Sequence, residues 1–140
     1  MSEITTVANN NLRTSNGKTT IFLCEDTVDG IFTAIYKAWE VGTSHTDVRV
    51  KDNCEFSFFE EYTEVATDLS LSFKVADSIN KKLGSEVFHY TYYSCLSNDK
   101  DKASCVYQFL RKAFRIGSDI MQYLSDGTVM KIFELTRAVS

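Results

Sequence analysis

Proline is absent from this sequence, and only six glycines are scattered through its 140 residues. No low-complexity tract and no internal repeat is present, which excludes proline-rich linkers and repeat architectures. The glycines form neither the phosphate-binding loop of nucleotide hydrolases nor the fingerprint of dinucleotide-binding folds. The sequence therefore lacks the glycine-rich motifs that cradle phosphates.

Cysteine and histidine are also scarce. The four cysteines, Cys24, Cys54, Cys95 and Cys105, lie far apart, so they match neither zinc-ligand spacing nor a disulfide framework, and we interpret them as free buried thiols. Neither histidine has the sequence context of a nucleophile and its base. We expect His45 in an exposed loop and His89 packed in the core. The sequence predicts no metal and no cofactor, contains no complete catalytic site, and leaves open whether the protein is an enzyme.

Long apolar runs are missing too. No stretch approaches the roughly 18 apolar residues that cross a bilayer. The first 18 residues have no apolar signal core. We therefore expect a cytoplasmic protein with no membrane partner.

What the sequence does contain is a pattern of short elements with helical spacing. Residues 1–18 are polar and predict a flexible arm, and residues 19–140 predict a single, helix-rich domain. A β-branched run at 19–24 predicts a strand, and 48–51 and 55–59 predict two further strands or a hairpin. Helical periodicity follows at 28–41, 68–83, 85–96, 103–116, 120–124 and from 129 onward. The expected fold class is α+β, with a small β-sheet packed against a helical majority.

Three carboxylates gather where the first strand meets the first helix. Glu25, Asp26 and Asp29 could hold a divalent cation at the edge of a sheet. Acidic residues in a first helical turn also stabilise the helix through its dipole, by about 0.3–1 kcal/mol, and we favour this interpretation. Gly30, inside the same first turns, predicts that another part of the backbone approaches closely.

Large side chains predict a well-filled core. The apolar face of the first helix includes Trp39, which we expect to be largely buried. The aromatic series from Phe88 to Tyr93 could stack on bases, but the interleaved basic residues of single-strand binders are missing and a core role is favoured. In the helix beginning near Asp68, we expect Leu69, Phe73 and Ile79 on the buried face.

Charge divides the chain in two. Residues 1–70 carry 5 Lys/Arg and 12 Asp/Glu, a net charge of −7, whereas residues 71–140 carry 10 and 7, a net charge of +3. Phosphate affinity depends on locally clustered cations, so a polyanionic partner would meet the second half. An ordinary solvated surface explains the same charges without a partner.

The chain resembles a bacterial family described as probable DNA metabolism proteins. The resemblance rests on Leu23 to Asp26, Asp29 to Phe32 and Ala34 to Trp39, and it continues through Lys74 to Ala76, Phe114 to Gly117 and Val129-Met130, covering about residues 19–140. The resemblance implies association with DNA modification or repair. Genes of this family tend to accompany the gene of a radical-SAM protein of DNA repair, and some family members are fused to a glycosylase-like domain. Family members continue into a second, more basic portion, so this chain is expected to be the N-terminal part of a longer protein.

Two classes of function follow from these observations. The first is a binding or adaptor module that contacts DNA through Lys81, Lys82, Arg111, Lys112, Arg115 and Arg137. The second is a divalent-cation-dependent enzyme of nucleic acid metabolism that uses the three carboxylates. A structural scaffold that docks the radical-SAM protein is a further alternative. The apolar face of the helix after residue 128 predicts a homodimer if nothing else covers it.

Overall fold

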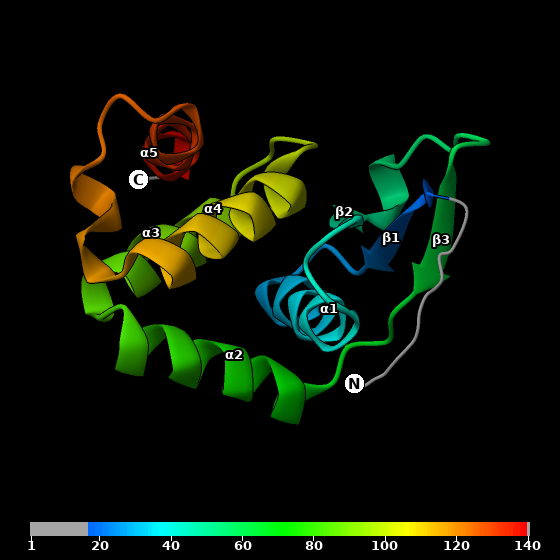
Figure 1. The fold of residues 1–140 in the computed structure, drawn as a ribbon, viewed down its shortest axis with the longest axis horizontal. Helices are drawn as coiled ribbons and strands as arrows, with labels where there is room; N and C mark the ends of the chain where they lie inside the picture. Colours follow the sequence, from blue (N-terminus) through cyan, green and yellow to red (C-terminus); the bar gives the residue numbers. More distant parts are fainter. Residues whose placement is uncertain (1–16, 140) are drawn as a thin grey trace.

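The computed structural model describes residues 17–139, and it confirms the α+β fold class (Figure 1). The described chain runs β1 (Thr19–Cys24), α1 (Val28–Val41), β2 (Thr46–Val50), η2 (Lys51–Asn53), β3 (Glu60–Glu64), α2 (Leu69–Lys82), α3 (Ser85–Cys95), α4 (Lys102–Ile116), η3 (Ser118–Gln122) and α5 (Gly127–Val139). The arm predicted at 1–18 lies almost entirely outside the described residues. No helix in the described part is long and apolar enough to span a membrane.

Two further strands follow β1, as one of the two predicted alternatives requires, but they do not form a hairpin. Its three strands are parallel in the order β2-β1-β3, so β2 and β3 lie on opposite sides of β1. The aromatic run at 55–59, expected to be a strand, is instead an exposed connection between β2 and β3. Parallel neighbours need a crossing connection, and the 3-10 turn Lys51–Asn53 begins it.

Helix α1 covers one face of the sheet and begins as the sequence predicts. The hydroxyl of Thr27 caps it by accepting a hydrogen bond from the backbone N–H of Gly30, at 2.8 Å. A Cβ atom at Gly30 would lie 2.5 Å from the carbonyl oxygen of Glu25. The close backbone approach expected at this glycine is therefore confirmed.

Helix α2 packs against α1 and α3, and helices α3, α4 and α5 pack against one another. The Asp68 side chain caps α2. Leu69 and Phe73, expected on the buried face, are both 68% exposed, whereas Ile79 is buried as expected, together with Ser72 and Val75. The hydroxyl of Ser72 donates to Asp29 of α1 at 2.6 Å, which fixes this different rotation of the helix. The predicted face of α2 was therefore right at Ile79 and wrong at Leu69 and Phe73.

Helix α5 is covered by its own chain. Val129, Ile132 and Leu135 are buried, and α5 packs against α3 and α4. Phe133 is half-buried against Tyr90, with their ring centroids 5.0 Å apart. The helical face that motivated the homodimer is thus largely enclosed within the described chain.

Candidate nucleic-acid interface

A groove of about 510 Å³ lies where the last turns of α1 and α2 meet the second half of α4. In Figure 1 the C-terminal ends of α2 and α4 lie on the side of the molecule away from β3. The groove, hereafter the basic groove, is lined by Trp39, Thr43, Ser78, Lys82, Leu110, Arg111, Phe114 and Arg115. Three of the six predicted DNA-contacting residues, Lys82, Arg111 and Arg115, therefore meet in one depression.

Aromatic rings form part of this groove. The rings of Trp39 and Phe114 pack edge to face, with centroids 5.3 Å apart and an interplanar angle of 86°. Both side chains are partly buried and pack against the core, which agrees with the prediction that Trp39 is largely buried. A half-buried tryptophan leaves part of its ring available to a ligand in the groove.

The cations of the groove are largely free of neutralising partners. Arg111 donates to the amide oxygen of Gln108 at 3.1 Å, and its guanidinium forms no ion pair within the described chain. Lys82 and Arg115 are exposed and likewise form no ion pair with residues 17–139. Lys82 and Arg115 lie in the last turns of α2 and α4, where cations also complement the helix dipole. Arg111 lies one turn earlier, so interaction with the helix dipole does not explain its position.

The other three predicted residues lie elsewhere. Lys81 pairs with Asp77 at 3.1 Å on the exposed surface of α2. The ammonium of Lys112 lies 2.7 Å from a carboxylate oxygen of Asp126. Arg137 is exposed in the last turn of α5. The six residues therefore do not form one contact surface.

Sequence reasoning missed the aromatic and polar members of the groove. Trp39, Phe114, Thr43 and Ser78 come from three separate segments, and only the packing of α1, α2 and α4 brings them together. One signal was present in the sequence: Arg111 and Arg115 are four residues apart, which places them on one face of a helix.

The three carboxylates at the start of α1 serve separate partners. The Thr67 hydroxyl donates to Glu25, and the Ser72 hydroxyl donates to Asp29. The buried ammonium of Lys102 lies 2.5 Å from Asp26 and donates to the carbonyl of Ser97 at 2.8 Å. Within residues 17–139, no group of three or more His, Cys, Asp or Glu side chains could hold a metal ion. The carboxylates thus tie α1 to its neighbours, which is more than the predicted effect on the helix dipole.

The thiols and histidines do not assemble a nucleophilic site. Burial raises the pKa of Cys24 to about 12 and also raises the pKa of Cys95, so both thiols are protonated at neutral pH. Cys24 and Cys95 are buried as predicted, whereas Cys54 and Cys105 are only half-buried. The prediction that His89 is in the core was wrong, because it is exposed and lies against Tyr93 at 4.6 Å between ring centroids.

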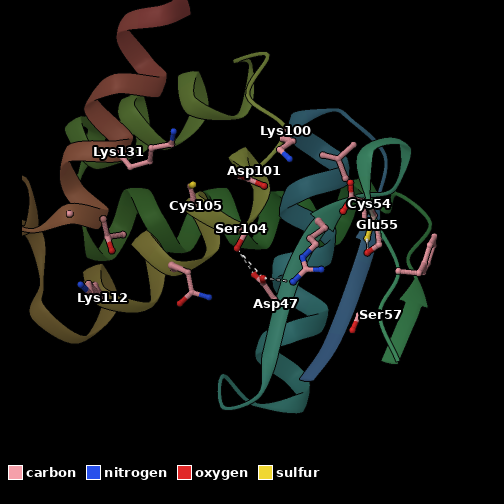
Figure 2. A pocket seen from close by; sticks show the side chains of 16 residues that line it. Asp47, Cys54, Glu55, Ser57, Lys100, Asp101, Ser104, Cys105, Lys112 and Lys131 are labelled. Carbon is pink, nitrogen blue, oxygen red and sulfur yellow. Dashed lines mark hydrogen bonds and ion pairs between the residues drawn. The ribbon is translucent and has the colours of Figure 1, made fainter. Parts of the chain in front are cut away.

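A second, larger cleft of about 880 Å³ separates the β2 edge from α4 and α5 (Figure 2). Its charges are mostly neutralised internally. Ser104 donates to both carboxylate oxygens of Asp47, at 2.8 and 3.0 Å, and the guanidinium of Arg49 binds Glu60 through two hydrogen bonds. Lys131 lies 3.0 Å from Asp99, just as Lys112 pairs with Asp126. Paired charges hold the walls of this cleft together and leave little excess charge to attract a polyanion.

The fold and the basic groove define an α+β domain with a cationic, aromatic-lined depression. Comparison with protein-family models, with curated proteins and with solved structures found no match. The resemblance to the DNA metabolism family therefore stays a prediction based on its motifs.

Proposed function

We propose that this chain is a binding or adaptor module that contacts the phosphates of DNA through the basic groove. The observation that carries the proposal is the convergence of Lys82, Arg111 and Arg115, without ion-pair partners in the described chain, around the half-buried Trp39. Three cations beside an aromatic ring match the combination that binds nucleic acid backbones and bases.

The combination of cations and aromatic rings supports a preference for single-stranded DNA. Unpaired bases can stack on exposed aromatic rings while the cations contact the phosphates. Because the chain as a whole has a formal charge of −4, we expect weak affinity and strong dependence on salt. Phosphate contacts carry no sequence information, so little sequence preference is expected.

A titration of labelled single- and double-stranded DNA at low salt tests the proposal. The double variant Arg111→Ala/Arg115→Ala removes two cations of the groove and should weaken binding strongly. The slope of log affinity against log salt should become shallower by about one for each phosphate that the variant no longer neutralises.

Lys81→Ala/Arg137→Ala is the matched control, because it also removes two cations, and both are exposed but lie outside the groove. This variant should bind DNA nearly as well as the wild type. Equal weakening in the control and the groove variant would show that only overall charge matters. Absence of any DNA binding by the wild type at low salt would contradict the proposal.

The family resemblance extends the proposal to a partner. An adaptor of this kind would bring DNA to a radical-SAM protein of DNA repair. Co-expression of the two genes and co-purification of the chains is the direct test. The proposed partner would be abandoned if the two proteins separate during purification at low salt while the DNA-binding result stands unchanged.

A further inference from the structure

Within residues 17–139, strand β3 is an edge strand whose outer side has no partner strand. It pairs with β1 alone, and no described element lies on its other side (Figure 1). The backbone N–H of Val65 donates to the carbonyl of Leu23 at 2.8 Å. Because backbone groups alternate sides along a strand, those of Tyr62 and Glu64 point away from β1. A second strand could pair with these groups.

Aromatic residues project from the segment that leads into this edge. Phe58 and Phe59 are 88% and 79% exposed, and Phe56 is 69% exposed. The segment is nevertheless ordered, since the Tyr62 hydroxyl accepts a hydrogen bond from the backbone N–H of Ser57 at 2.7 Å and the rings of Phe56 and Tyr62 pack edge to face. Exposed aromatic groups held in a fixed conformation are typical of a surface that meets a partner.

Charge identifies the kind of partner. Residues 51–64 contain one Lys and five Asp/Glu, so this segment has a net charge of −4, equal to that of the whole chain. Glu60 is neutralised by Arg49 and Glu64 lies 4.0 Å from Lys51, whereas Glu61 forms no ion pair within residues 17–139. Like charges on paired strands are destabilising, so β3 of a second copy is a poor occupant. An anionic membrane surface or a nucleic acid would be repelled as well.

We propose that the free edge of β3, together with Phe58 and Phe59, docks an extended segment of a partner protein that is rich in lysine or arginine. The segment adds a strand to the sheet through the backbone groups of Tyr62 and Glu64. Alternate side chains of such a strand lie on one face. Basic residues at those positions face Glu64, which lies on the opposite face of the sheet from Glu61, and an apolar residue of the segment covers the two phenylalanines.

A short labelled peptide tests this docking surface. The probe is a fluorescein-labelled heptapeptide, Lys-Val-Lys-Thr-Lys-Val-Lys, whose binding is followed by fluorescence anisotropy at low salt. The full chain should bind it, and a peptide with glutamate in place of lysine should not bind. No binding of the lysine peptide would overturn the proposal.

Two substitutions at one position separate backbone pairing from charge. Glu64→Ala removes only the carboxylate, whereas Glu64→Pro also removes the N–H that points away from β1 and leaves the β1–β3 ladder untouched. Loss of a hydrogen bond should make binding to Glu64→Pro about two- to tenfold weaker than binding to Glu64→Ala. Equal affinities would refute strand addition.

Two further measurements protect the test from misfolding and from confusion with the basic groove. The two lysine peptides with N-methyl groups on the odd or on the even residues each lose the backbone donors of one side, so one of them should bind the wild type more weakly than the other even if Glu64→Pro fails to fold. The groove variant Arg111→Ala/Arg115→Ala should bind the lysine peptide as the wild type does. Weaker binding to that variant would place the peptide outside the β3 edge and overturn the proposal.

Discussion

Substitution of Gly30 by alanine should destabilise the protein, although alanine is the better helix former. In an unobstructed helix the change would stabilise by about 0.8–1.0 kcal/mol. Here the new Cβ atom would lie 2.5 Å from the carbonyl oxygen of Glu25 and 3.0 Å from the Oγ1 atom of Thr27. Since the first of these atoms belongs to the backbone, the turn before α1 must move.

The cost of that movement exceeds the gain in helix propensity. Strain of this kind costs about 1–3 kcal/mol. Displacing Thr27 also weakens the cap that accepts from the N–H of residue 30, and removal of a cap costs about 1 kcal/mol. We therefore expect a net decrease of about 1–3 kcal/mol in the free energy of unfolding. The melting temperature should fall by about 3–10 °C.

Gly127→Ala is the matched control for this prediction. Gly127 is the first residue of α5, and a Cβ atom there would meet nothing within 4 Å. This variant should be as stable as the wild type or slightly more stable. Thermal unfolding followed by far-UV circular dichroism compares the three proteins. A melting temperature for Gly30→Ala at or above that of the wild type would refute the argument from close approach.

Three further predictions concern titration, binding and thiol reactivity. Hydrogen bonds from the backbone N–H of Asp101 and from Lys131 lower the pKa of Asp99. The ionised carboxylate therefore stabilises the fold above its unfolded pKa, and this stabilisation is lost as the pH falls through the folded pKa. In urea unfolding between pH 7 and pH 3, the free energy of unfolding should depend less on pH for Asp99→Asn than for the wild type. Trp39 is the single tryptophan and lines the groove, so DNA bound there should change its emission, and unchanged emission at saturation would place the DNA elsewhere. Cys24, with its raised pKa and full burial, should resist alkylation in the native protein and react after unfolding, as read by mass spectrometry.

Helix positions were predictable because their signals are local. Thr27 and Asp68 cap helices as their side-chain chemistry predicts, and Gly84 and Gly117 end helices with positive φ angles. The same local signals failed for β3, whose sequence Glu60–Glu64 contains a single aromatic residue and three glutamates. That strand depends on pairing with β1 and on the contact between Arg49 and Glu60, and both are distant in sequence.

The candidate site was predictable only in part, for a related reason. A count of charges placed the cations in the second half of the chain but could not show which are neutralised. Lys102, Lys112 and Lys131 are held by Asp26, Asp126 and Asp99, whereas Arg111 and Arg115 are not held by carboxylates in the described chain. Such pairing depends on the tertiary structure, and so does the meeting of Trp39 with Phe114.

The distribution of charge sets how two partners would influence each other. In Figure 1 the C-terminal ends of α2 and α4, which line part of the basic groove, lie on the side of the molecule away from β3, so a nucleic acid bound there keeps its phosphates away from the acidic edge. A basic partner segment on β3 would neutralise the −4 charge of residues 51–64 and so reduce long-range repulsion of DNA. Binding free energies are reciprocal, so DNA would strengthen binding of the segment by the same factor. Because charges separated by more than about 8 Å are screened at physiological salt, this coupling should be measurable at low salt and fade as salt is added.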